Sequence, residues 1–257
     1  MLPDKNKLPI SVTVITFNEA ESLKDCLLSV AFAKDIVVVD SGSGDETVSI
    51  AKSMGARVFN NPWPGYGQQK NFALNKAQFD WVLCLDADER VDNTLKKSVV
   101  EAINNAEEQY QGYSMARQNH LLGRGLRHGF GYPDYKVRLV NRRYGRWTEP
   151  PVHEFIEVDG PVGQLKGDIL HFSGENLLEY LEKQNRYTSL QAKIMADKNV
   201  SLLPLRIVFN PIFCFFKGYF IKRAFLDGLP GLIHTVFHCF TTFTKYAKLY
   251  ELRRKNK

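Results

Sequence analysis

Acidic and polar side chains follow three apolar runs in the first third of the chain, each at the point where a run ends. These groups are Thr16-Phe17-Asn18-Glu19, Asp40-Ser41-Gly42-Ser43 and Asp86-Ala87-Asp88-Glu89. A single such residue often caps the next helix, but capping does not need an Asp-x-Asp pair directly after a buried strand. Because ligands of parallel sheets bind outside the carboxyl ends of the strands, the three groups predict one binding site.

These carboxylates suit a diphosphate that is held through a metal ion. The turn after the first run lacks the Gly-x-Gly-x-x-Gly pattern whose backbone N–H groups cradle a pyrophosphate. A diphosphate here therefore needs a cation between it and the carboxylates. Carboxylate oxygens favour Mg²⁺ or Mn²⁺, which keep phosphate oxygens and waters as their other ligands. We expect Asp88 to bind that ion directly and Asp86 to face a ribose or a metal-bound water.

Three further residues are candidates for contacts with a nucleotide. Asp40, one predicted strand over, is placed to accept a hydrogen bond from a base N–H such as N3 of uracil, and Phe17 could flank that base. Lys70 could reach the base or a phosphate, and the alternative is a solvated lysine on a helix surface.

An alternation of short apolar runs with helical segments positions these groups. Runs at residues 10–16, 35–40, 56–59 and 81–85 predict strands, and the segments 20–30, 45–54, 66–77 and 93–105 predict helices. Strands that are apolar on both faces and alternate with helices indicate a parallel sheet covered on both sides. The sequence therefore predicts an α/β fold of Rossmann-like type whose strand ends meet at one edge.

The pattern loosens after residue 112. A strand is expected at 136–141, within a segment (117–154) that is rich in Gly, Arg, His and Trp; long irregular segments of compact domains are usually functional. A helix is expected at 176–196, and an aromatic, basic, helical region follows it. We expect three parts: a nucleotide-binding half at 1–115, an acceptor-binding and catalytic half at 116–175, and a C-terminal helical appendage at 176–257.

The net charge of +6 lies wholly in the C-terminal region. Of the 34 Lys and Arg and the 28 Asp and Glu, 10 basic and 2 acidic residues follow residue 200, so this region carries +8 and the rest of the chain −2. A nucleic-acid-binding protein would more often spread basic residues over its main body. No nucleic-acid partner is therefore expected.

The same region is expected to associate with a membrane surface without crossing it. Charged residues and prolines interrupt the apolar stretch 202–221. One helical face carries Leu232, Val236, Phe240, Phe243 and Ala247. Such a stripe beside basic residues suits a helix in the interface of an anionic membrane, and the alternative is a helix packed on the catalytic domain. The N-terminus has no apolar signal-peptide run, so a cytoplasmic protein is expected.

The three strand-end groups together resemble the nucleotide-binding half of family 2 glycosyltransferases over about the first 115 residues. The resemblance is carried by Thr16-Phe17-Asn18-Glu19, by residues 37–47 (VVVDSGSGDET) and by Leu85-Asp86-Ala87-Asp88-Glu89. It implies a GT-A fold, a UDP-sugar donor, a divalent metal and inversion at the anomeric carbon. The residues then expected to bind the nucleotide-sugar are Thr16, Phe17, Asn18, Glu19, Asp40, Lys70, Asp86 and Arg138.

A later segment is similar to the bacterial lipopolysaccharide inner-core β-1,4-glucosyltransferases that modify a heptose. The similarity rests on Tyr132-Pro133-Asp134-Tyr135-Lys136-Val137-Arg138-Leu139, Gly145-Arg146-Trp147 and Val152-His153-Glu154. It implies transfer of a hexose, glucose, to a lipid-linked saccharide by a peripheral enzyme on the cytoplasmic face of the inner membrane. Another cell-surface glycan as acceptor is the alternative.

Two carboxylates are candidates for the base that activates the acceptor hydroxyl. Family members usually take this base from a Glu-Asp pair beyond the Asp-x-Asp strand, and that pair is absent here. Asp134, on a loop before a predicted strand, is the first candidate, with a turn-forming surface Asp as its alternative, and Glu154 is the second. His153 could complete the metal shell beside Asp88, in competition with His171, or it could be a packing histidine.

Two other functions fit part of the pattern. A phosphoryl-transfer enzyme would use Asp86 as its nucleophile, but such enzymes usually have a small Thr or Val where this chain has Arg90. That function would also give Asp40 no role. A binding module that keeps the nucleotide fold without catalysis would not need both Asp86 and Asp88.

Overall fold

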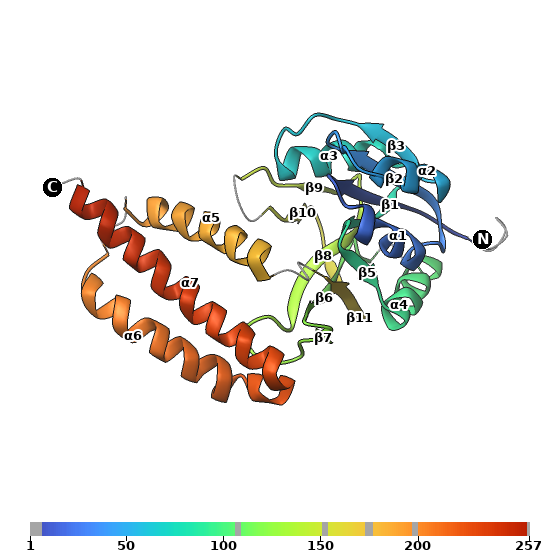
Figure 1. Cartoon of the computed structure of the whole chain (residues 1–257). Helices are drawn as coiled ribbons and strands as arrows, with labels where there is room; N and C mark the ends of the chain where they lie inside the picture. Colours follow the sequence, from blue (N-terminus) through green and yellow to red (C-terminus); the bar gives the residue numbers. More distant parts are fainter. Residues whose placement is uncertain (1–6, 106–108, 151–153, 173–176, 197–199, 256–257) are drawn as a thin grey trace. The chain divides into compact units, whose positions relative to one another are not determined.

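The computed structural model describes residues 7–105, 109–150, 154–172, 177–196 and 200–255, with the backbone alone for 177–180 and 183 (Figure 1). The chain divides into two compact units. The sheet unit comprises the residues up to Arg117 and Asp134–His171, and the helical unit comprises Gln118–Pro133 and the residues from Phe172 onward. The three parts predicted from the sequence divide the chain by role instead, and they stay predictions.

Four parallel strands form one half of the sheet in the sheet unit. They are β1 (Leu8–Thr16), β2 (Ala33–Asp40), β3 (Arg57–Asn60) and β4 (Trp81–Asp86), in the spatial order β3-β2-β1-β4. Each lies where an apolar run predicts a strand, because β-branched residues fit a pleated strand that is covered on both faces. The predicted α/β fold is confirmed.

Helices cover both faces of these strands. They are α1 (Ala20–Ser29), α2 (Thr47–Ser53), α3 (Tyr66–Lys76) and α4 (Asn93–Asn104). Leu23 of α1 and Leu95 of α4 share one buried cluster with Val12, whereas Ala73 of α3 packs with Ile15 in another. Val12 and Ile15 point to opposite faces because side chains alternate along a strand. α1 and α4 therefore cover one face of the sheet, and α3 covers the other.

The second half of the sheet is antiparallel and comes mostly from later residues. β8 (Asp134–Asn141) pairs with β4, and the order continues through β6 (Gly112–Leu121) and β11 (Val162–His171) to β5 (Glu89–Val91). A separate two-stranded sheet joins β9 (Gly145–Trp147) to β10 (Ile156–Val158). This arrangement brings residues of 134–171 beside the strand that carries the Asp-x-Asp pair.

The register of the parallel half brings the three strand-end groups to one edge. Thr16 pairs with Asp40 across β1 and β2, and its neighbour Ile15 pairs with Asp86 across β1 and β4. Adjacent strands lie about 4.8 Å apart. Asp40 and Asp86 therefore flank the end of β1 from two sides, with their backbones roughly 10 Å apart.

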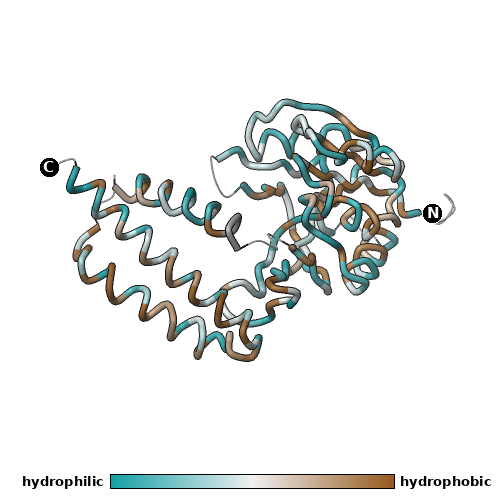
Figure 2. The backbone as a smooth tube through the Cα atoms, viewed as in Figure 1, coloured by the Kyte–Doolittle hydropathy of each residue, from teal (hydrophilic) through white to brown (hydrophobic). Residues whose placement is uncertain are grey.

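Three long helices make up most of the helical unit: α5 (Leu177–Ala196), α6 (Leu203–Phe216) and α7 (Gly228–Lys255). A π-helical segment (η2, Lys217–Ile221) and a 3₁₀ turn (η3, Ala224–Asp227) connect α6 to α7. α7 packs against both α5 and α6 and lies between them in Figure 1. Figure 2 shows hydrophobic stretches along α6. Within the described ranges, a helix with both the length and the apolar character needed to cross a membrane is not found.

Asp227 fastens the loop after β7 (Arg124–Gly125) to the start of α7. Its buried carboxylate accepts the backbone N–H groups of Arg127 and His128 at 3.0 and 2.8 Å, and its Oδ1 lies 2.9 Å from His128 Nδ1. A buried carboxylate is stabilised by such hydrogen bonds. One side chain thus ties the 118–133 segment to the rest of the helical unit.

Candidate active site

Hydrogen bonds join the turn after β1 to the turn after β2. Asn18 has φ +53°, its backbone N–H donates to Ser43 Oγ at 2.8 Å, and its Oδ1 accepts the N–H of Gly44 at 2.8 Å. The N–H of Glu19 donates to Thr47 Oγ1 at 2.8 Å. Asn visits the left-handed conformation more readily than most residues. These hydrogen bonds therefore hold the two turns together at the edge of the sheet.

Thr16 and Phe17 differ sharply in exposure at this edge. Phe17 exposes 55% of its surface, so its ring is available to a flat ligand. Thr16 is buried, and its Oγ1 makes no hydrogen bond within the described part of the chain. A buried hydroxyl is normally hydrogen-bonded, so Thr16 is an exception, and its contact with a nucleotide-sugar stays a prediction.

The carboxylate of Asp40 builds the turn that follows its own strand. Asp40 is buried, and its Oδ2 accepts the N–H groups of Gly42 and Ser43, both at 2.9 Å. Its Oδ1 accepts the Ser43 hydroxyl at 2.5 Å. Asp side chains commonly stabilise turns in this way. Both carboxylate oxygens are thus engaged within the turn, and the contact of Asp40 with a base stays a prediction.

Two cations hold Asp86 at the end of β4. Its Oδ1 lies 3.0 Å from Lys70 Nζ, and its Oδ2 lies 3.2 Å from Arg138 Nη2. Burial raises the pKa of Asp86, but Lys70 and then Arg138 outweigh burial and hold that pKa well below its usual range. Asp86 is therefore ionised at neutral pH.

Lys70 is buried on α3, so it is not a solvated surface lysine. Its Nζ lies 2.9 Å from Glu154 Oε1, in addition to its contact with Asp86, and 4.5 Å from the centre of the Trp147 ring. Burial lowers the pKa of Lys70, yet the two carboxylates outweigh burial and raise it above its usual value. Lys70 therefore stays charged and joins Asp86 to Glu154.

Glu89 is a fully buried carboxylate behind Asp86. Its Oε2 accepts the backbone N–H of Asp86 at 3.0 Å, and its Oε1 accepts a hydrogen bond from Arg138 Nη2 at 3.0 Å. Burial lowers the pKa of Arg138, but Glu89 and Asp86 outweigh burial and raise it above its usual value. Arg138 thus holds both carboxylates and lies 5.3 Å from the centre of the Trp147 ring.

Asp134 lies at the other end of the same chain of ion pairs. Arg117 Nη2 is 3.0 Å from Asp134 Oδ2, and Arg117 Nη1 is 3.8 Å from Glu89 Oε1. Lys136 Nζ lies 3.1 Å from Asp134 Oδ1. Alternating charges therefore run in the order Glu154, Lys70, Asp86, Arg138, Glu89, Arg117 and Asp134. The two candidate bases, Asp134 and Glu154, are the outermost carboxylates of this order, with Lys136 as a further cation beside Asp134.

Asp88 lies beside a histidine of β11. Its Oδ2 is 3.3 Å from His171 Nε2, and its side chain is 23% exposed. The pairing of β11 with β5, which sets His171 opposite Glu89, produces this contact. A group of three or more His, Cys, Asp and Glu side chains arranged to hold a metal is not found in the described ranges. His153 lies outside the described residues, so the roles of Asp88 and His153 as ligands stay predictions.

Glu89, Arg117 and Trp147 are among the residues of this cluster that were not assigned a role from the sequence. Glu89 directly follows the Asp-x-Asp pair, so its acidic type at a strand end was an available signal. Trp147 stood in a recognised motif, but the motif does not show that its ring faces two cations. Arg117 carried no signal, because its contact with Glu89 depends on the strand order of the antiparallel half.

The amino-acid sequence matches the model of a known protein family over most of the sheet unit. The family is described as glycosyl transferase family 2, and the match covers residues 11–156, more than half of the chain. The chain belongs to glycosyl transferase family 2. All strand-end groups of this glycosyltransferase lie within the matched residues, as do Lys70, Asp134, Arg138 and Glu154.

Two bacterial relatives are similar over nearly the whole enzyme. The lipopolysaccharide core biosynthesis glycosyltransferase LpsC of Rhizobium meliloti (strain 1021) is 32% identical over 252 residues, which cover 95% of this chain and 93% of LpsC. An uncharacterised glycosyltransferase of Rickettsia prowazekii (strain Madrid E) is 31% identical over 258 residues, which cover 96% and 88%. The prediction of a glycosyltransferase that resembles lipopolysaccharide core enzymes is confirmed. The similarity also extends into the helical unit.

Two solved structures show weaker likeness. TarS 1–349 of S. aureus in complex with UDP-GlcNAc has a TM-score of 0.49 and 14% identity, with 97% of this chain and 93% of that chain covered. Glucosyl-3-phosphoglycerate synthase of Mycobacterium tuberculosis, in complex with Mn²⁺, UDP and glucosyl-3-phosphoglycerate, has a TM-score of 0.47 and 17% identity, with 75% and 80% covered. Likeness at this level carries no argument about the site.

Proposed function

We propose that this family 2 glycosyltransferase moves a hexose from a UDP-sugar, held through Mg²⁺ or Mn²⁺, to a lipid-linked saccharide at an anionic membrane surface. One observation carries the proposal. Asp86 ends β4 beside the end of β1, and Lys70 and Arg138 hold it ionised. Asp88 follows two residues later in the chain. A pair of acidic residues at the carboxyl edge of a sheet suits a diphosphate that binds together with a divalent cation.

The balance of charge at this edge supports the need for a cation. The carboxylates of the ion-pair chain, together with Asp88, are Asp86, Asp88, Glu89, Asp134 and Glu154, and the cations are Lys70, Arg117, Lys136 and Arg138. Carboxylates therefore outnumber cations, and a diphosphate alone would increase the excess of negative charge. A divalent cation that binds with it offsets the negative charge that the diphosphate adds.

Asp88 is the proposed direct ligand of this cation. Its carboxylate oxygens suit Mg²⁺ or Mn²⁺, and His171 Nε2, 3.3 Å from Asp88 Oδ2, adds an imidazole nitrogen of the kind that metals often bind. His153 remains the candidate from the sequence for the same place. These residues leave room in the coordination shell for diphosphate oxygens and waters. When bound, such an ion neutralises negative charge on the departing diphosphate.

The turn after β1 and the end of β2 are proposed to bind the nucleoside. The half-exposed ring of Phe17 is available to stack on the uracil, and Asp40 Oδ1 accepts its N3–H. Thr16, which directly precedes Phe17 and whose buried Oγ1 makes no hydrogen bond within the described residues, is proposed to support this pocket from the end of β1. Asn18 and Glu19 shape this pocket through the backbone bonds that brace the two turns.

Asp134 is proposed as the base that takes the proton of the acceptor hydroxyl. The Asp134 side chain is 30% exposed and pairs with Arg117 and Lys136. The Glu154 side chain is only 16% exposed and pairs with the buried Lys70. A base must be reachable by the hydroxyl it serves. Transfer that survives Asp134→Asn but is lost in Glu154→Gln would assign the role to Glu154 instead.

The class of acceptor is proposed from a relative, and the donor sugar and the heptose from the resemblance of residues 132–154 to inner-core glucosyltransferases. LpsC is a lipopolysaccharide core biosynthesis glycosyltransferase, and the similarity covers 95% of this chain. We propose glucose as the hexose and the heptose of a lipopolysaccharide inner core as the acceptor, with inversion at the anomeric carbon. A different cell-surface glycan is the second candidate acceptor.

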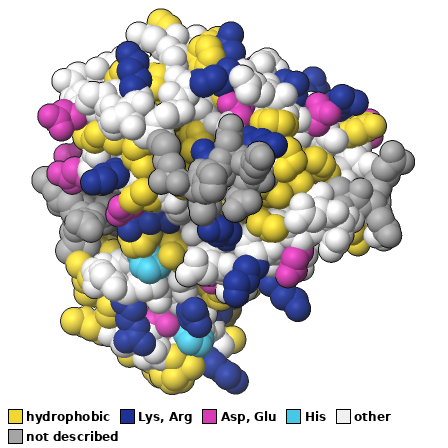
Figure 3. Space-filling view, turned by 90° about the vertical axis from the view of Figure 1, so that its right-hand side faces the viewer, with side chains coloured by type: hydrophobic (Ala, Val, Ile, Leu, Met, Phe, Trp, Pro, Cys, Tyr) yellow, Lys and Arg dark blue, Asp and Glu magenta, His cyan; other side chains and the backbone are white. Residues whose placement is uncertain are grey.

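The cytoplasmic face of the inner membrane is the proposed place of action, because a lipid-linked acceptor is presented at a membrane surface. The +8 charge after residue 200 fits an anionic leaflet. Nucleic acid is not a proposed partner. Figure 3 shows Lys and Arg side chains interspersed with side chains of other types on one face, and a nucleic-acid-binding protein would more often spread its basic residues over its main body.

A panel of UDP-sugars, each with and without Mn²⁺, tests the donor proposal. We expect UDP-glucose with Mn²⁺ to raise the melting temperature and to release UDP, and we expect Asp88→Asn to lose both effects. Failure of every UDP-sugar to stabilise the protein in Mn²⁺ would contradict the proposal. Stabilisation without UDP release, even with a lipopolysaccharide acceptor, would favour a non-catalytic binding module.

A further inference from the structure

One side of α6 exposes a continuous row of large apolar side chains. The row contains Leu205, Val208, Phe209, Ile212, Phe213 and Phe216, which each expose between 50 and 64% of their surface. Their spacing of three and four residues places them on one face of the helix. An apolar face this long is unusual on a monomeric soluble protein unless it has a partner.

The opposite side of α6 is apolar too, and α7 already covers it. Leu203 and Ile207 pack with Tyr246 and Leu249 of α7, and Cys214 Sγ lies 4.0 Å from Thr242 Oγ1. At about 100° per residue, these positions of α6 lie opposite the exposed row. A helix that is apolar all round is normally buried on all sides, so α6 has one covered face and one that is left for another contact.

The exposed row continues beyond α6 into η2 and η3. Phe220, Ile221, Phe225 and Leu226 expose between 44 and 71% of their surface. The rings of Phe216 and Phe220 stack with their centres 5.7 Å apart. We call these four residues, together with the six residues of the row on α6, the α6 face.

Only positive charge accompanies the α6 face along the chain. Arg206, Lys217, Lys222 and Arg223 are exposed, and residues 201–226 contain no Asp or Glu. Arg206 and Lys217 lie on the same flank of the row, each about 100° round the helix from its centre. A protein partner of ordinary composition would not require this one-sided charge. Large apolar side chains beside exposed cations match a bilayer with anionic head groups.

We propose that the α6 face docks the enzyme on an anionic phospholipid bilayer. Phenylalanine and leucine side chains enter the boundary between head groups and acyl chains, and the arginine and lysine side chains contact lipid phosphates. The inference rests on the proposed function, because a lipid-linked acceptor is presented at such a surface, and it adds the part of the enzyme that binds there. Binding itself can be measured without any sugar transfer.

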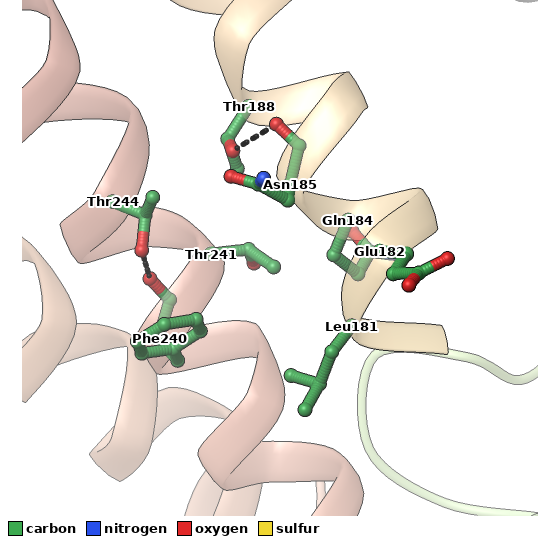
Figure 4. A pocket seen from close by; sticks show the side chains of 8 residues that line it. All are labelled: Leu181, Glu182, Gln184, Asn185, Thr188, Phe240, Thr241 and Thr244. Atoms are coloured by element: carbon green, nitrogen blue, oxygen red, sulfur yellow. Dashed lines mark hydrogen bonds between the residues drawn. The ribbon is translucent and has the colours of Figure 1, made fainter. Parts of the chain in front are cut away.

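This assignment differs from the helix that the sequence favoured for the same role. Phe240, in the stripe predicted on α7, lines a cavity of about 310 Å³ between α7 and α5, together with Leu181 and Thr188 of α5 (Figure 4). Val236, Phe240 and Phe243 of that stripe expose between 45 and 51% of their surface, so the stripe on α7 is a second exposed apolar face, shorter than the α6 face. The row on α6 faces away from the residues that pack against α7.

Flotation with lipid vesicles tests the proposal on the full-length chain. Vesicles of phosphatidylcholine, with and without phosphatidylglycerol, are mixed with the wild type and with the double variant Phe209→Glu and Phe213→Glu. The matched control carries Leu28→Glu and Val162→Glu, which are also exposed apolar positions. Circular dichroism confirms that all three proteins are folded.

The wild type and the matched control are expected to float with the anionic vesicles, less so at high salt, and the double variant to bind at least about tenfold more weakly. Equal binding by the double variant and the wild type would overturn the proposal, as would a wild type that does not float. A wild type that sediments as a dimer, with a monomeric double variant and no flotation, would assign the face to a second copy instead.

UDP release from UDP-sugar, measured on the same preparations without vesicles, separates this inference from the proposed function. We expect the double variant to release UDP at the wild-type rate, because the changed residues lie outside the sheet-edge site. If the double variant floats as well as the wild type and both proteins release UDP, only the assignment of the docking face is overturned. Intact flotation without UDP release in any protein would overturn the enzymatic proposal alone.

Discussion

Replacing Lys70 with methionine removes a buried cation that two carboxylates share. Lys70 Nζ lies 3.0 Å from Asp86 and 2.9 Å from Glu154, and its side chain is 7% exposed. Methionine is of similar length and fills most of the same space. The substitution therefore changes the charge at the site far more than the packing.

The contacts set the size of the expected loss. Removing one partner of a buried ion pair costs about 3–5 kcal/mol, because the other charge stays buried without compensation. Asp86 keeps Arg138 at 3.2 Å, so we expect the lower end, about 3 kcal/mol of unfolding free energy. At about 2–4 °C per kcal/mol for a chain of this size, the melting temperature falls by about 6–12 °C.

The pH dependence separates the electrostatic cause from a packing defect. Burial raises the pKa of Asp86, but Lys70 and Arg138 outweigh it, so the folded-state pKa lies below the value of about 3.9 in an unfolded chain. Ionised Asp86 therefore stabilises the fold above that value, and this contribution is lost as the pH falls through the folded-state pKa. In Lys70→Met the pKa of Asp86 rises. The stability difference is then full at neutral pH and narrows as the pH falls below about 4.

Scanning calorimetry of both proteins at neutral pH and at about pH 3 makes the comparison, with Lys76→Met as the control. Lys76 lies on the same helix, and no ion pair of Lys76 is found in the described part of the chain. We expect this control to change the unfolding free energy by less than about 1 kcal/mol. A Lys70→Met variant that melts like the control, or with the same deficit at both pH values, would refute the reasoning.

Three other substitutions probe separate parts of the account. Asp88→Asn is expected to lower Mn²⁺-dependent UDP release at least about 100-fold, while calorimetry without ligands shows a change below about 1 kcal/mol, since Asp88 is partly exposed. Asp134→Asn is expected to slow transfer to the acceptor at least about 100-fold and to leave UDP binding by titration unchanged; equal transfer rates would remove Asp134 from the mechanism. In Gly67→Ala the new methyl would lie 2.1 Å from the Thr148 carbonyl oxygen, so urea unfolding should show a loss of about 1–3 kcal/mol. Gly44→Ala, whose Cβ would meet nothing within 4 Å, is the control, and an equal loss there would contradict a steric cause.

The parallel half of the sheet could be predicted because its signals are local. A run such as 35–40 is apolar and β-branched whatever surrounds it, and β2 ends at Asp40 as the prediction requires. The meeting of Thr16, Asp40 and Asp86 at one edge follows from the common direction of parallel strands. The fold class and the position of the site can therefore be predicted from the sequence.

The partners of the site residues could not be predicted, because they depend on contacts between distant residues. Lys70 and Arg138 were expected near a nucleotide, but they lie 16 and 52 residues from Asp86 along the chain. Arg138 reaches Asp86 because β8 pairs with β4, and Lys70 reaches it because α3 packs on the sheet beside this strand end. His171 reaches Asp88 for the same kind of reason, through the pairing of β11 with β5.

The apolar character of 202–221 was visible in the sequence, but its division into two faces was not. Periodicity shows that Ile207 and Phe209 lie on different sides of a helix. It does not show that α7 covers the side with Ile207 and leaves Phe209 exposed. The docking face on α6 therefore had to be found in the fold.

Calorimetric titration of UDP into the wild-type enzyme, with Mn²⁺ and with a chelator, measures whether the diphosphate needs a divalent cation. The proposal is that the acidic edge around Asp86 and Asp88 accepts a diphosphate only together with a divalent cation. The account predicts measurable binding in Mn²⁺ that disappears in the chelator and in Asp88→Asn. Binding of equal affinity in the chelator would contradict it.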